Sequence, residues 1–101
     1  LPMDQVSICT YACTVAALFG KDKWCREHLP GIPVIYTQHK EKLAHPTALL
    51  IDDYDDHCDN FALHGHSILF PRRWNKNSGL DPINHLVERY NEILRLPNRI
   101  L

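Results

Sequence analysis

The run Thr47-Ala48-Leu49-Leu50-Ile51-Asp52-Asp53 decides the fold class of this chain. Its apolar part, residues 48–51, has no polar alternation and is followed directly by two carboxylates. Strands that are buried on both faces of a parallel sheet have this pattern. The run therefore predicts a buried strand with two adjacent acids at its carboxyl end.

Three more runs of strand length have the same β-branched or aliphatic character, at 6–10, 32–37 and 66–70. Helical segments are predicted at about 15–29 and 55–64, and the nine-residue link 38–46 is too short for a regular parallel crossover, so a single irregular helical turn is expected there. In the segment 55–64, we expect Phe61 and Ala62 to face inward and Gly65 to form a left-handed cap. The inward face of the segment 15–29 is expected to hold Leu18, Trp24, Cys25, His28 and Leu29.

After residue 70 the pattern changes to a polar loop at 71–80 and an amphipathic helix at 81–96. Asp81 is expected to cap this helix, with Pro82 at its first position and an end near 96–97. Its apolar stripe consists of Ile83, Leu86, Val87, Tyr90, Ile93 and Leu94. The whole order predicts an α/β fold, a three-layer, mostly parallel sheet of about four strands with flanking helices.

The length of 101 residues suits one small domain, 1–101, rather than two independent ones. The formal net charge of −1 argues against a strongly basic nucleic-acid-binding surface. No apolar run approaches the ~20 residues of a membrane span, so we expect a cytoplasmic protein with no membrane partner. The chain begins without an initiating Met, which suggests a fragment.

Four cysteines could pair in three ways, but the composition is not that of a disulfide scaffold, and reduced thiols are expected. Cys9, Cys25 and Cys58 are expected to pack as small buried apolar residues. The seven histidines show no spacing typical of a structural zinc site.

Functional side chains collect beyond the carboxyl ends of parallel strands. Thr10 ends the first strand, and its hydroxyl, with the N–H groups from Tyr11 onward, could hold an anionic oxygen or simply cap a helix. Lys40 lies in the polar stretch after the second strand, which could also be a solvated turn. Asp52 and Asp53 end the third strand, where a hard divalent ion is the natural counter-charge, and Mg²⁺ suits one or two carboxylates together with a phosphate. Such a set of groups suits phosphoryl transfer.

Four segments are relevant to the family, namely the strand ending Ile8-Cys9-Thr10, the helix with Lys23-Trp24-Cys25-Arg26-Glu27, the turn Thr37-Gln38-His39-Lys40 and the strand Leu49-Leu50-Ile51-Asp52-Asp53. In their order and spacing they resemble the 5'(3')-deoxyribonucleotidase branch of the haloacid dehalogenase superfamily, including its phage-type relatives. The resemblance covers about residues 6–70. It implies a Rossmann-like fold and a Mg²⁺-dependent phosphomonoesterase that acts on a substrate such as a nucleotide.

The same resemblance assigns roles to individual residues. Thr10 would hydrogen-bond the transferring phosphoryl group, with Tyr11 beside it in the substrate site. Lys40 would neutralise charge on the nucleophile and the phosphate, with Lys42 as the alternative if the register is shifted by two. Asp52 and Asp53 would hold Mg²⁺.

One family feature is missing, namely the Asp-x-Asp motif on a first central strand that supplies the nucleophile and the general acid. Asp4 stands alone before Thr10, and Asp53-Tyr54-Asp55 belongs to a different turn. The family places that strand between those corresponding to 6–10 and 47–52, so we expect a truncated, split or degenerate half-site that is inactive alone. Its partners would be a second copy or a chain that supplies the strand, unless strands 6–10 and 47–52 pair directly.

An alternative of another class is a non-catalytic interaction module that binds a nucleotide, a nucleic acid or a protein. Its support is the loop 71–80, where cations accompany an aromatic ring that could stack on a base. The simpler interpretation, which we favour from the sequence, is a rim loop in which Trp74 covers the edge of the core. The cations are Arg72, Arg73 and Lys76.

Overall fold

The strands form two separate parallel pairs, each accompanied by helices. The structure is a computed structural model, and it describes residues 5–96. The chain divides into a first unit, Leu1–His39, and a second unit, Lys40–Leu101, which are described one at a time. The predicted α/β class with parallel strands is therefore confirmed.

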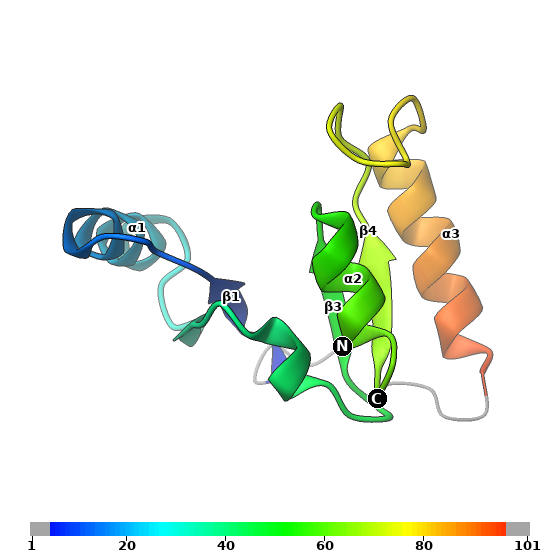
Figure 1. The fold of residues 1–101 in the computed structure, drawn as a ribbon, viewed down its shortest axis with the longest axis horizontal. Coiled ribbons are helices and arrows are strands. Elements are labelled where there is room, and N and C mark those ends of the chain that lie inside the picture. The colour runs from blue at the N-terminus through cyan, green and yellow to red at the C-terminus, as the bar shows by residue number, and fades with distance from the viewer. Residues whose placement is uncertain (1–4, 97–101) are drawn as a thin grey trace. The chain divides into compact units, whose positions relative to one another are not determined.

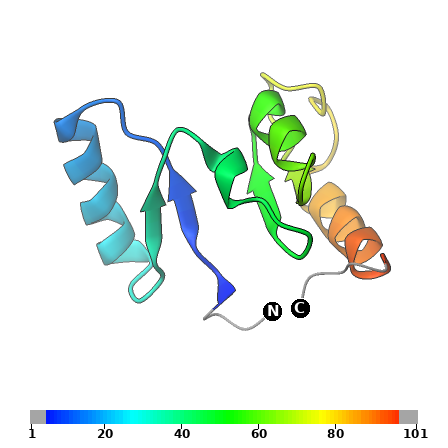
Figure 2. The same cartoon turned by 60° about the horizontal axis from the view of Figure 1, so that its bottom comes forward.

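In the first unit, β1 (Ile8–Thr10) pairs in parallel with β2 (Val34–Tyr36), and α1 (Val15–His28) connects them. Figure 2 shows the two arrows side by side and pointing the same way. The α1 helix begins at Thr14, whose Oγ1 accepts a hydrogen bond from the Ala17 N–H at 3.0 Å. The segment predicted at about 15–29 is thus a helix with the expected bounds.

The predicted inward face of α1 is only partly correct. Cys25 is buried, but Trp24 is 54% exposed and stacks on His28 with ring centroids 4.4 Å apart. The helix has apolar residues on several sides, since Val15 and Phe19 are also exposed. An apolar stripe read from spacing alone therefore does not select the buried face in this helix.

The second unit holds β3 (Leu49–Asp52) and β4 (His66–Leu69), which pair in parallel with Asp52 opposite Leu69. The helix α2 (Asp55–Phe61) packs against both strands and α3 (Pro82–Leu94) against β4 (Figure 1). A 3₁₀ turn, η2 (Lys40–Leu43), precedes β3 and confirms the irregular turn predicted in the link 38–46. The buried residues described in this unit are Leu50, Cys58, Phe61, Ile68, Leu69, Pro71, Asn75 and Ile93.

The helix α2 is shorter than predicted and ends at Phe61, so Phe61 is buried as expected while Ala62 is exposed. Gly65 is not a left-handed cap, because Gly31 and Gly79 are the glycines with positive φ among the described residues. A Cβ on Gly65 would lie 2.9 Å from Phe61 Cε1 and 3.0 Å from the His45 carbonyl oxygen. Close backbone approach, rather than backbone conformation, requires glycine there.

The helix α3 confirms the predicted start, since Asp81 Oδ1 accepts a hydrogen bond from the Asn84 N–H at 3.1 Å and Pro82 is the first helical residue. Its apolar stripe is divided, because Ile93 is buried whereas Ile83 and Val87 are 62% and 52% exposed. Residues 71–80 form the predicted loop, without helix or strand.

All four cysteines are free, as expected. Cys25 and Cys58 are buried, but Cys9 is only half-buried and Cys13 is exposed. Strands 6–10 and 47–52 do not pair directly in the described part of the chain, because β1 pairs with β2 and β3 with β4. None of the helices described for residues 5–96 has the length and apolar character to cross a membrane.

Candidate functional site

The centre of the second unit's candidate site is an ion pair between Lys40 and Asp52. Lys40 opens η2 and Asp52 ends β3, so the 3₁₀ turn brings the lysine back to the carboxyl end of the strand. Lys40 Nζ lies 2.6 Å from Asp52 Oδ2, and the two side chains are only 12% and 7% exposed. Each charge of a buried pair depends on the other, because either charge alone would be desolvated without a partner.

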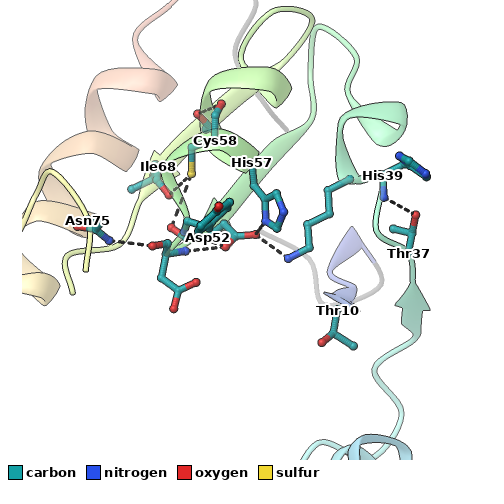
Figure 3. Close-up of polar contacts among 12 residues, drawn as sticks. Thr10, Thr37, His39, Asp52, His57, Cys58, Ile68 and Asn75 are labelled. Carbon is teal, nitrogen blue, oxygen red and sulfur yellow. Dashed lines mark hydrogen bonds and ion pairs between the residues drawn. The ribbon is translucent and has the colours of Figure 1, made fainter. Parts of the chain in front are cut away.

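The Asp52 carboxylate is fully engaged. Its Oδ1 accepts hydrogen bonds from the N–H groups of Asp53 at 2.7 Å and Tyr54 at 3.2 Å, and His57 Nδ1 lies 3.3 Å from Oδ2 (Figure 3). Burial alone would raise the pKa of this carboxyl, but the hydrogen bond and charge of Lys40, together with the Asp53 N–H, outweigh burial and lower it. Asp52 is therefore ionised at neutral pH and serves as the anchor of the site.

Asp53 has the opposite character. Its carbonyl oxygen accepts hydrogen bonds from Asn75 Nδ2 at 2.9 Å and Trp74 Nε1 at 3.1 Å. Within residues 5–96 no Lys, Arg or His side chain forms an ion pair with its carboxylate, and its contact with the Asp52 side chain contributes to the lowered pKa of Asp52. The backbone of Asp53 is fixed while its charge stays available.

Asn75 fixes the Asp53 backbone through its side-chain hydrogen bonds, and it is only 7% exposed. Its Nδ2 also donates to the Phe70 carbonyl at 2.8 Å, and its Oδ1 accepts from the Asn77 N–H at 3.0 Å. A buried side-chain amide with its donors and acceptor paired stabilises one loop conformation. The loop after β4 is thereby fastened to the turn after β3.

Cys58 lies beneath the same turn, and its thiol is buried. Its Sγ lies 3.7 Å from the Asp52 carbonyl oxygen and 3.6 Å from that of Ile68. Burial, with the Asp52 charge as a second cause, raises the pKa of this thiol to about 11. A neutral, buried thiol is a packing residue rather than a nucleophile.

The donor chemistry of the turn fits a Mg²⁺ ligand at one position. Mg²⁺ binds one or two carboxylates and keeps waters and phosphate oxygens as its other ligands. Asp53 offers such a carboxylate, whereas Asp52 is committed to Lys40 and two N–H groups. Within residues 5–96, no three His, Cys, Asp or Glu side chains are grouped to hold a metal ion by themselves.

The first unit contains the other predicted residues. Thr10 ends β1, and its Oγ1 accepts a hydrogen bond from Lys21 Nζ at 3.1 Å. Lys21 Nζ also donates to the Tyr11 carbonyl, while the Tyr11 side chain is 47% exposed. The Thr10 hydroxyl thus faces a cation within its own unit, and it does not cap α1, which Thr14 does. Asp4 lies outside the described residues.

The structure brings Lys40, rather than Lys42, into an ion pair with Asp52. Sequence reasoning missed three polar residues of these sites, namely Lys21, His57 and Asn75. His57 could have been found, because it lies in the first turns of a helix that starts three residues after the strand-ending Asp52. Asn75 offered no such signal, since loop contacts are not periodic.

Comparison with known proteins finds no family model that matches the chain and no significantly similar curated protein or solved structure. The family resemblance therefore rests on the quoted motifs, and the geometry above is independent of it.

Proposed function

We propose that this chain carries the metal- and phosphate-binding half of a phosphomonoesterase site of the haloacid dehalogenase type, with a nucleotide as the natural class of substrate. The observation that carries the proposal is the buried Lys40–Asp52 pair beside the carboxylate of Asp53, with which no cation of residues 5–96 forms an ion pair. A cation and a free carboxylate at the end of a parallel strand are the groups that phosphoryl transfer uses.

Each residue has a separate role in this proposal. Asp52 orients Lys40, and the ammonium group neutralises part of the charge of a bound phosphoryl group. Asp53 holds Mg²⁺, which when bound would neutralise further phosphate charge. The Asn75 and Trp74 hydrogen bonds to the Asp53 carbonyl keep that carboxylate in place. The phosphate-binding role of Thr10 stays a prediction, and its contact with Lys21 supports an anion site within the first unit.

The proposed site lacks a nucleophile of its own, because no Asp-x-Asp motif ends a strand before Thr10 in the sequence. Among the described residues, β1 pairs only with β2 and β3 only with β4, so each of these strands keeps one unpaired edge. An unpaired parallel strand accepts a further strand readily. In the complete Rossmann-like sheet that we propose, a strand from another segment, another chain or a second copy fills these edges and supplies the nucleophile.

The test is Mg²⁺ binding by the full chain, measured by isothermal titration calorimetry, beside hydrolysis of p-nitrophenyl phosphate. We expect Mg²⁺ binding that Asp53→Asn abolishes, and no turnover. Asp56→Asn is the matched control, because Asp56 is an exposed acid of α2 with the same charge. Equal Mg²⁺ binding by the two variants would refute the metal site, and turnover abolished by Asp52→Asn would refute the half-site.

A second candidate is the non-catalytic interaction module, and one observation favours it. Trp74, which the simpler interpretation of the sequence places over the edge of the core, is 59% exposed. Salt-dependent binding of a single-stranded oligonucleotide, lost in Trp74→Ala, together with no Mg²⁺ binding, would support the module over the phosphatase half-site.

A further inference from the structure

Lys21 is a cation of α1 that is directed at the end of β1 rather than at an acid. It lies about two turns into the helix, and helical side chains point toward the N-terminus of their helix, so its ammonium group reaches back toward the strand. There Nζ donates hydrogen bonds to Thr10 Oγ1 at 3.1 Å and to the Tyr11 carbonyl oxygen. The two acceptors are the last residue of β1 and the residue after it.

The other charged side chains of α1 pair with one another. Arg26 Nε lies 2.8 Å from Asp22 Oδ2, and Lys23 Nζ lies 3.9 Å from Glu27 Oε1. Lys21 forms no ion pair with a carboxylate of residues 5–96. Both acids of the helix are thus paired with other cations, and the charge of Lys21 acts on the oxygen atoms at the end of β1.

The hydrogen bond from Lys21 determines how the Thr10 hydroxyl can be used. An ammonium group has only donors, so Thr10 Oγ1 is the acceptor and its own hydrogen points elsewhere. None of the hydrogen bonds described within residues 5–96 uses that hydrogen. A hydroxyl that accepts from a cation becomes a stronger donor, because hydrogen bonds in a chain polarise one another. The Thr10 hydroxyl is therefore an oriented donor, and a phosphate oxygen is a strong acceptor that matches it.

From these contacts we infer that Lys21 is a positioning residue of the phosphate site, because it holds the Thr10 hydroxyl in the orientation in which it donates to the phosphoryl group. The inference rests on the proposed function, in which Thr10 contacts that group, and it adds no second phosphate site. Lys21 lies outside the four segments that carry the family resemblance, so its role is derived from the contacts within the first unit alone.

The experiment is a calorimetric titration of the full chain with inorganic phosphate in the presence of Mg²⁺. Lys21→Met is expected to weaken phosphate binding at least about fivefold, because the Thr10 hydroxyl loses its orientation and polarisation. Lys23→Met is the matched control and is expected to bind phosphate like wild type, since Lys23 is an exposed lysine of the same helix that pairs with Glu27. Circular dichroism of both variants shows whether α1 stays formed.

A double-mutant cycle with Thr10→Val separates a positioning role from other roles of Lys21. If Lys21 acts through the Thr10 hydroxyl, then adding Lys21→Met to Thr10→Val weakens phosphate binding no further. A second loss of the same size in the double variant would overturn the inference. It would show instead that the Lys21 charge acts directly on the phosphate, or that Lys21 only supports the loop through the Tyr11 carbonyl.

The same titrations separate failure of this inference from failure of the proposed function. Phosphate binding by wild type, with equal affinities in the Lys21 and Lys23 variants, would overturn the inference and leave the proposed function standing. No phosphate binding by wild type would overturn the proposed function, and the inference with it.

Discussion

Replacement of Lys40 by Met tests whether the buried ion pair organises the second unit. The side chains of Lys40 and Asp52 are 12% and 7% exposed, so the substitution leaves a carboxylate with little access to water. Removal of one partner of a buried pair typically costs about 3–5 kcal/mol. Asp52 keeps two backbone N–H donors and His57, which places the expected cost at the lower end, about 3 kcal/mol.

A loss of about 3 kcal/mol corresponds to about a 150-fold change in the unfolding equilibrium constant. Urea unfolding of the full chain, followed by Trp74 fluorescence in a Trp24→Phe background, reports on the second unit alone. Lys42→Met is the matched control, because Lys42 is an exposed residue of the same 3₁₀ turn. Its effect is expected to stay within about 0.5 kcal/mol.

Equal unfolding midpoints for the Lys40 and Lys42 variants would refute the reasoning. A double variant, Lys40→Met with Asp52→Leu, adds a second check. Replacement of both charges by apolar side chains removes the stranded carboxylate, so most of the lost stability should return. If the double variant is as unstable as Lys40→Met, burial of an unpaired charge is not the cause.

Three further predictions concern stability and reactivity. Gly65→Ala should destabilise the protein by about 1–3 kcal/mol in urea unfolding, because the new Cβ would lie 2.9 Å from a Phe61 atom. Gly20→Ala is the opposite case, since a Cβ there has nothing within 4 Å, and it should stabilise α1 by about 0.5–1 kcal/mol. The lowered pKa of Asp52 stabilises the fold above its unfolded pKa of about 3.9, and this stabilisation is lost as pH falls through the folded pKa below that value. The urea midpoint of wild type should therefore fall more steeply below about pH 4 than that of Asp52→Asn, and parallel pH profiles would contradict this. With a pKa of about 11, the buried Cys58 thiol should resist iodoacetamide in the native chain at pH 8 while the exposed Cys13 is alkylated, as peptide mass analysis would show, and rapid modification of Cys58 would exclude the packing role.

The elements of the fold could be predicted from sequence because their signals are local. The four apolar runs correctly predicted four strands, and Asp81 and Pro82 correctly predicted the start of α3. The link 38–46 gave one 3₁₀ turn because its length excludes a regular crossover helix. Burial was less predictable, as the exposed Trp24, Trp74 and Ile83 show, because it depends on what packs against each face.

The sequence allowed the residues of the candidate site to be proposed, but not their contacts. The positions of Lys40, Asp52 and Asp53 follow from the rule that functional groups gather at the carboxyl ends of parallel strands. The contacts of Asn75 and Lys21 depend on loop and helix geometry that no spacing encodes. Gly65 is a similar case, since its requirement comes from the His45 and Phe61 atoms around it and not from its own φ.

The adjacent acids Asp52 and Asp53 show why identical residues side by side in the sequence acquire different chemistry. Asp52 is the last residue of β3, where the strand direction fixes its carboxylate toward Lys40 and the N–H groups of the following turn. One position later the chain has left the sheet, and Asp53 is held through its carbonyl by Asn75 and Trp74. Fixing the backbone rather than the carboxylate leaves the charge of Asp53 available to an external cation. The strand end thus separates a carboxylate that is paired with Lys40 from one that has no cation partner within residues 5–96, and under the proposed function removal of Asp52 should reduce stability while removal of Asp53 should reduce metal binding.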